Sequence, residues 1–522
     1  MKRRKFLELG ALASSCVLIH ARETRAAAPN LEEISISDLQ AAMSAGSTNS
    51  RQITQAYIDR IQQIDPQIKS VVEVNHDALE IAARLDAERE SGKLRGPLHG
   101  IPVLIKDNID TADKMKTTAG SLALVNAPTP NEDAFVAAKL RQAGAVILGK
   151  TNLSEWANYR STSSSSGWSG RGGQTRNPYI LDRTPCGSSS GSGTAIAANL
   201  AAVAVGTETN GSIICPSANN ALVGIKPTLG LISRSGIIPI AASQDTAGPM
   251  ARTVADAAIL LGAMVGTDAN DAITSQATKG LTDYSKFLKA DGLKGKRIGV
   301  ARNYFGSASK IDTIMESSLK VLESCGAQLV DIQVPMTGLA DSSSQVLSFE
   351  FKDGVNKYLT RRGGSIKSLA DLIEFNEKHA DLEMKYFKQE LLLSSQAKEN
   401  LESRTYRLAI LQAKTISQDA IDGAMDKDKL DAITGPSNGP AWLIDLVSGD
   451  GGSRNSYVST TTPAAVSGYP NITVPAAFLS ELPIGISFWG RAFSEPVLIE
   501  IAFAFEQAAQ ARRKPKFLPS YL

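Results

Sequence analysis

Two serine-bearing turns lie close together between Pro185 and Pro216, in the stretch PCGSSSGSGTAIAANLAAVAVGTETNGSIICP. The first is the Gly/Ser loop from Cys186 to Gly193, whose small side chains permit unusual backbone conformations and leave amide N–H groups open to a ligand. The second is Thr209-Asn210-Gly211-Ser212. A short helix, Thr194 to Leu200, and a buried strand, Ala201 to Gly206, are expected between them. This compact unit predicts that Ser188 and Ser212 come side by side in a functional site.

A nucleophilic serine needs a base, and histidine is scarce in this chain. Beyond His20, the histidines are His76, His99 and His379, and none stands in HExxH or in a Cys/His metal spacing, so no metal site is expected. A lysine is the remaining candidate.

Lys106 ends a near-continuous apolar strand that starts at Leu98. An amine buried there must be paired or must lose its proton. The alternative is structural: Lys106 reaches the surface or pairs with Asp107 or Asp110.

Three chemistries compete for the Gly/Ser loop. Gly187 and Gly191 fit the outer glycines of a nucleophile elbow, but that motif needs a strand directly before it and a histidine after an acid. A phosphate loop is disfavoured because G-K-[ST] is missing. In the third arrangement a desolvated lysine activates a serine. Keeping it neutral near pH 7 lowers its pKa by ~3 units, or about 4 kcal/mol, which burial at a strand end can supply.

The flanking segments predict an α/β fold in which a mixed, twisted sheet lies between helical layers. Ser37 is expected to cap a helix from Asp38 to Ala45, and Ser50 a longer helix that stops at Pro66. Helix 133–143 followed by the buried strand 145–150 has the spacing of an α/β unit. Residues of about 339–460 are more polar and carry long helical patterns, so they are interpreted as a helical cap or insertion on a single domain.

The N-terminus resembles an export signal. Arg3-Arg4 precede an 11-residue apolar run, too short to span a bilayer, and Ala26-Ala27-Ala28 offers a cleavage site. Residues 1–28 are therefore expected to be a twin-arginine signal peptide, which places the mature protein, residues 29–522, in the periplasm or outside the cell without stable membrane insertion.

Charge and cysteine content exclude other classes. Residues 1–28 hold six of the 55 Lys/Arg and two of the 53 Asp/Glu, so the remainder carries 49 positive and 51 negative side chains, a net of −2. Without a basic stripe, no nucleic-acid partner is expected. Three cysteines remain after cleavage. This number is small and odd, so a disulfide framework is not expected. Cys186 and Cys215 flank the serine turns; a bridge is conceivable, but buried free thiols are favoured.

The segment from Arg95 to Met250 resembles the amidase signature family of serine hydrolases. The matching motifs are GPLHGIPVLIKDNID, TTAGS, AGAVILGKTNLSEWA, QTRNPY, CGSSSGSG, GTETNGS, GIKPT and QDTAGPMARTVADA, and GYPNITVP with LPIGISFWG extends the likeness toward the C-terminus. These define a signature core at about 95–250.

The resemblance implies the family fold, no cofactor, and a Ser-cisSer-Lys triad. When the family's triad is carried over to this sequence, Lys106 is the base and Ser212 is the acylated nucleophile. Ser188, which is joined to Gly187 by a cis peptide bond, relays the proton between them. Ser189 is the neighbouring alternative for the relay. The backbone N–H groups of Thr209, Asn210, Gly211 and Ser212 would form the oxyanion hole.

Departures from the common G-G-S-S-G-G and D-T-G-G-S-I-R patterns point to the peptide amidase branch. Cys186 and Ser190 each replace a glycine, Glu208 an aspartate, Asn210 a glycine and Ile214 an arginine. The expected reaction is hydrolysis of a linear carboxamide, with C-terminal peptide amides as the favoured substrates and other amides, esters or lactams open. The alternatives are a non-catalytic binding protein with the same fold and an amidotransferase-type subunit.

Overall fold

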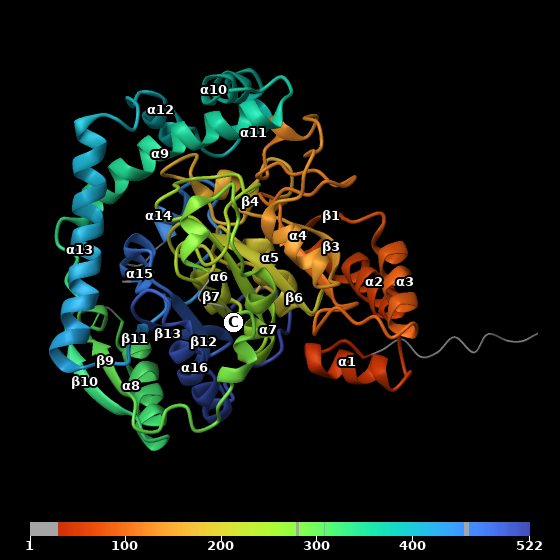
Figure 1. Ribbon diagram of the computed structural model, residues 1–522. Helices are drawn as coiled ribbons and strands as arrows, with labels where there is room; N and C mark the ends of the chain where they lie inside the picture. Colours follow the sequence, from red (N-terminus) through yellow and green to blue (C-terminus); the bar gives the residue numbers. More distant parts are fainter. Residues whose placement is uncertain (1–29, 278–280, 307, 454–458, 522) are drawn as a thin grey trace, which may run out of the picture.

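The computed structural model describes residues 30–277, 281–306, 308–453 and 459–521. The proposed signal, residues 1–28, lies outside these ranges. An eleven-stranded mixed sheet forms the centre of the molecule (Figure 1). In spatial order its strands are β1 (Val71–Val74), β3 (Val146–Thr151), β2 (Pro102–Lys106), β6 (Val203–Glu208), β8 (Thr246–Ala251), β7 (Val223–Lys226), β12 (Asn471–Leu479), β13 (Leu482–Trp489), β11 (Ala432–Pro436), β9 (Arg297–Ala301) and β10 (Gln328–Ile332).

Strand β2 ends in Lys106, and strand β6 leads into the turn that carries Ser212. Parallel pairing of these two strands brings their ends together. Strand β2 pairs in parallel with both β3 and β6, while β6 pairs antiparallel with β8. All residues of β2, β3 and β6 are buried, as expected for strands covered on both faces. The sheet is mixed and helix-covered, as predicted. The small sheet β4–β5 (Trp168–Ser169, Gly173–Gln174) lies in the loop before the Gly/Ser motif.

Helices cover both faces of the sheet. They are α1 (Ile36–Ser44), α2 (Ser50–Ile68), α3 (Ala78–Glu90), α4 (Phe135–Gln142), α5 (Ser190–Ala197), α6 (Ile214–Asn219), α7 (Val254–Met264), α8 (Ser309–Ser324), α9 (Leu339–Arg362), α10 (Leu369–Lys378), α11 (Ala380–Glu383), α12 (Glu390–Gln396), α13 (Arg404–Asp428), α14 (Gly449–Ser453), α15 (Thr461–Ser467) and α16 (Glu495–Ala509). Within the described ranges, no helix is both long and apolar enough to cross a bilayer.

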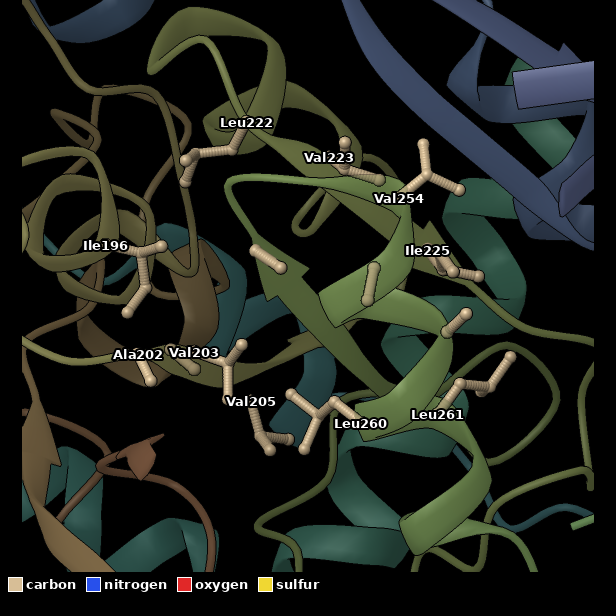
Figure 2. Packing of buried hydrophobic residues seen from close by; sticks show 14 of the residues in the cluster. Ile196, Ala202, Val203, Val205, Leu222, Val223, Ile225, Val254, Leu260 and Leu261 are labelled. Atoms are coloured by element: carbon tan, nitrogen blue, oxygen red, sulfur yellow. The ribbon is translucent and has the colours of Figure 1, made fainter. Parts of the chain in front are cut away.

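Alternation along β6 separates its two faces. Val203 and Val205 pack with Leu260 of α7 in the main hydrophobic core (Figure 2). Gly206 points to the opposite face, because successive strand residues alternate. A Cβ atom there would lie 2.8 Å from Ser189 Oγ, so only glycine lets the serine loop lie this close to the strand.

Several predicted element boundaries were wrong. Ser35, not Ser37, caps α1 through a capping box with Asp38, and Asn49, not Ser50, caps α2. Helix α2 continues past Pro66 to Ile68. Strand β6 begins and ends two residues later than the predicted 201–206.

Helices α9 to α13 arch along the top and left edge of the molecule in Figure 1. The predicted cap, 339–460, also contains β11, which lies between β13 and β9 in the main sheet. The long helices of this range therefore end at Asp428, and only the short α14 follows β11 within it. Glu383 of α11 joins it to the core, because its Oε1 accepts a hydrogen bond from Ser121 Oγ (3.1 Å) and its Oε2 lies 3.8 Å from buried Arg160.

Candidate active site

Lys106 ends β2 with its side chain fully buried. Its Nζ lies 2.7 Å from Ser188 Oγ, 2.9 Å from Thr207 Oγ1 and 3.1 Å from Thr207 O. A neutral amine can donate to both Thr207 oxygens and still use its lone pair to accept the Ser188 hydroxyl proton. The geometry therefore suits a base.

The purely structural alternative for Lys106 does not hold. Asp107 is paired with Arg171 at 2.9 Å, and Asp110 with Arg362 at 3.2 Å, so neither acid neutralises the lysine. Burial lowers the pKa of Lys106 from 10.5 to about 7, because the charged form loses its hydration, while the charges of Asp245 and Glu208 act weakly in the opposite direction.

Two other lysines, Lys150 and Lys226, are equally buried, and burial lowers the pKa of each to about 8. Lys150 contacts Thr117 Oγ1 at 2.9 Å and Ile109 O, whereas Lys226 donates to Pro227 O at 2.9 Å. Of these three lysines, Lys106 alone contacts a serine hydroxyl. Burial alone therefore does not distinguish the three lysines, whereas the contact with a serine hydroxyl identifies Lys106 as the candidate base.

The peptide bond between Gly187 and Ser188 is cis. Ser188 is 1% exposed and faces Lys106. Ser189, the alternative relay, is turned to β6 instead: its Oγ donates to Thr207 O (3.0 Å) and accepts from Thr207 N (3.1 Å). The rest of the loop is helical, since α5 starts at Ser190 rather than at the predicted Thr194.

Ser212 lies in the tight turn between β6 and α6. Glu208 fixes this turn, because its Oε2 accepts from Ile213 N (2.7 Å) and Ile214 N (3.0 Å) at the start of α6. Gly211 has a φ of 81°, in the left-handed region that favours glycine. The turn therefore has a fixed backbone.

The backbone N–H groups of residues 209–212 donate to no acceptor within the described chain. Unpaired backbone donors beside a serine hydroxyl are the groups that an oxyanion hole requires.

The structure brings the two serine turns together through the backbone. Ser189 N donates to Ser212 O at 3.2 Å. Across the described residues no hydrogen bond joins Ser188 Oγ to Ser212 Oγ. Ser212 is 8% exposed and is thus the more accessible of the two serines.

Cys186 and Cys215 form a disulfide, with Cα atoms 5.9 Å apart. The expectation of two free thiols was therefore wrong. The sequence separates them by 29 residues, and only the fold-back of α5 and β6 brings the two serine turns near enough for a bridge. Each cysteine lies within three residues of a serine in the site, so the bridge ties one turn to the other.

Removal of this bridge has a predictable cost. We expect Cys186→Ser/Cys215→Ser to unfold with a free energy lower by about 3.6 kcal/mol, the loop-closure entropy that a bridge over about 30 residues removes from the unfolded chain. Urea denaturation measures this difference. Cys325→Ser, which removes the partly exposed free cysteine, should change it little, and equal stabilities of the bridged and unbridged proteins would contradict the prediction.

A cavity of about 360 Å³ opens beside the site. Thr207, Glu208 and Thr209 form its inner end, and α9 supplies part of its outer wall. Lys106, Ser188 and Ser212 are not among its lining residues, so it adjoins the site through the end of β6 and the turn that follows.

The sequence did not single out three residues of this region. Thr207 contacts Lys106, Asn108 donates to Thr207 Oγ1 at 3.0 Å, and Asp245 accepts from Thr209 Oγ1 at 2.5 Å. The motifs GPLHGIPVLIKDNID, GTETNGS and QDTAGPMARTVADA contain all three, but a position within a motif assigns no role. Burial raises the pKa of Asp245 to about 6.

A buried lysine, two serines and free backbone N–H groups, carried by a mixed sheet between helices, are the features of a hydrolase that uses lysine in place of histidine. Comparison with known proteins is more specific: the family model described as Amidase matches residues 52–499. The chain belongs to this family, which confirms the resemblance and the predicted fold class.

Three similar proteins illustrate the relationship. A probable amidase of Arabidopsis thaliana is 41% identical over 502 residues, covering 94% of this chain and 92% of its own. The X-ray structure of the native peptide amidase from Stenotrophomonas maltophilia is 47% identical with a TM-score of 0.88, covering 94% and 99%. A glutamyl-tRNA(Gln) amidotransferase subunit of Thermoanaerobacter pseudethanolicus is 33% identical, covering 93% and 98%.

Proposed function

We propose that this amidase hydrolyses the C-terminal carboxamide of peptides through Lys106, Ser188 and Ser212. The observation that carries the proposal is the contact between the Lys106 amine, whose pKa burial lowers to about 7, and the Ser188 hydroxyl. The extended similarity to a peptide amidase supports the substrate class.

In the proposed reaction Ser212 Oγ attacks the carbonyl carbon of the amide. Its proton passes to Ser188 Oγ as the Ser188 proton passes to Lys106 Nζ, and the N–H groups of residues 209–212 stabilise the oxyanion. This relay needs a hydrogen bond between the two hydroxyls, and such bonds often tighten only when substrate is bound.

Collapse of the tetrahedral intermediate breaks the C–N bond. The proton on Lys106 returns through Ser188 to the leaving nitrogen, so ammonia departs and the acyl group remains on Ser212. Water then attacks the ester by the same relay, which releases the acid and restores the serine. We propose that internal peptide bonds are not cleaved.

A fluorophosphonate probe combined with product analysis tests the proposal. We expect peptide mapping to place the label on Ser212, and mass spectrometry of amidated peptides to show conversion to the acid with ammonia release and an intact backbone. An unlabelled, inactive protein would indicate a binding role. Activity that appears only with glutamine and a partner protein would indicate an amidotransferase.

The pH dependence follows from Lys106. Since the neutral amine is the base, kcat/KM should rise through pH 7 and level off above it, falling about tenfold per pH unit well below pH 6. The negative charge of Asp245 holds the pKa of Lys106 up, so Asp245→Asn should move this acid limb to lower pH. A flat pH profile between 5 and 9 would contradict the assignment.

We also propose that the protein is exported by residues 1–28. The Cys186–Cys215 disulfide supports this, because such bonds persist in oxidising compartments. Cell fractionation should find the enzyme outside the cytoplasm. The Arg3→Lys/Arg4→Lys variant should instead remain in the cytoplasm. Unchanged export of that variant would exclude the twin-arginine route.

A further inference from the structure

The cavity beside the site has two chemically different ends. At its inner end Glu208 and Asp245 are engaged by backbone N–H groups: Asp245 Oδ2 accepts from Ile240 N (2.8 Å) and Ala241 N (2.9 Å). These two acids therefore hold the backbone of the cavity wall and of the turn that carries Ser212. Apolar side chains, among them Ala157, Ile238 and Ile240, also line the cavity.

Helix α9, which crosses the top of the molecule in Figure 1, supplies Lys357 and Arg361 to the outer end. They stand four residues apart and so lie on the same face of the helix. Both are exposed, with side-chain exposures of 74% and 61%.

The charge of Arg361 is the least compensated at this end. Arg234, the third cation of the wall, is bound by Asp271 through Nε at 2.9 Å. Lys357 pairs with Asp353 at 2.7 Å. Arg361 lies 3.9 Å from its nearest carboxylate oxygen, on Asp110.

Asp110 itself is engaged elsewhere. Its other oxygen accepts hydrogen bonds from Tyr358 OH (2.8 Å) and Arg362 (3.2 Å). Arg361 thus shares Asp110 with Arg362 at the longer distance. Its guanidinium lies 5.8 Å from the centre of the Tyr358 ring, and with 61% of its side chain exposed it remains open to a ligand.

We propose that Arg361, assisted by Lys357, selects amidated peptides that carry a carboxylate side chain at or next to the amidated residue. This inference rests on the proposed function. A peptide whose terminal carbonyl meets the N–H groups of residues 209–212 would run along the apolar wall toward α9. A cavity of this size accommodates a small ligand, so a nearby side chain of the peptide reaches the cationic end.

Kinetics on matched substrates test the proposal. The series is acetyl-Glu-Leu-amide against acetyl-Gln-Leu-amide, and acetyl-Leu-Glu-amide against acetyl-Leu-Gln-amide, which differ only in charge. For at least one pair we expect a preference of about three- to tenfold for the acid, expressed in KM because solvent-exposed charges attract only modestly. High salt should reduce this preference.

The Lys357→Gln/Arg361→Gln variant should lose the preference and hydrolyse the neutral peptides as before. Arg407→Gln is the matched control: Arg407 is 65% exposed, lies 3.9 Å from Glu402, and does not line the cavity. That variant should retain the preference.

Two outcomes separate this inference from the proposed function. If the neutral peptide amides are hydrolysed but the acidic ones are not preferred, or if the preference survives in the double variant, the inference is wrong and the function stands. If the wild type hydrolyses no peptide amide, the proposed function fails and takes the inference with it.

Discussion

The Lys106→Met variant is expected to lose at least about 10⁴-fold in kcat/KM, because members of a catalytic triad act as a unit. Methionine nearly preserves the length and apolar volume of the side chain but offers no amine. Ser188 would then have no acceptor for its proton within the site, and Ser212 would attack only as a neutral hydroxyl. Steady-state hydrolysis of an amidated peptide, with thermal melting to verify folding, measures the loss.

Lys226→Met provides the control for burial itself. Lys226 is as buried as Lys106, has a pKa lowered by the same cause, and contacts Pro227 O rather than a serine. We expect this variant to stay within about tenfold of wild-type kcat/KM. Equal losses in both variants would show that a buried lysine near the turns supports the fold, and would remove the case for Lys106 as base.

Much of the sheet was predictable because its strands are buried on both faces. The apolar runs that end at Lys106 and Lys150 have no alternation, and they became the neighbouring strands β2 and β3. Helix ends were less predictable, since several polar residues near each start can cap it. Ser35 replaced Ser37 because its side chain pairs reciprocally with Asp38.

The cap was the least predictable part of the fold. Long helical patterns dominate residues 339–428, and they concealed a five-residue strand, β11, just beyond them. A short strand in the interior of a sheet is specified by its neighbours β13 and β9 on either side, which a local pattern does not contain.

In the site, residue types predicted the participants but not their partners. The scarcity of histidine and the apolar strand that ends at Lys106 indicated a lysine base. The contribution of Thr207 depends on a contact across two strands, and the disulfide depends on the fold-back between the serine turns. Neither distance is encoded by separation along the chain, so both required the three-dimensional arrangement.

The two adjacent serines give the second large expected effect. Ser188→Ala should lower kcat/KM by about 10³-fold or more, because it interrupts the path from Ser212 to Lys106. Ser189→Ala removes an equally buried hydroxyl, but one whose two hydrogen bonds go to the Thr207 backbone. It should cost about 1–3 kcal/mol of stability and leave kcat within about tenfold.

A combined Lys106→Met/Ser188→Ala variant should be no slower than Lys106→Met alone, since a relay without its base has nothing further to lose. Multiplicative losses would show that Ser188 acts independently of the lysine. A larger loss of kcat in Ser189→Ala than in Ser188→Ala would transfer the relay to Ser189. The 2.7 Å contact between Lys106 and Ser188 argues for the opposite order, because a proton moves along the hydrogen bond that reaches the base.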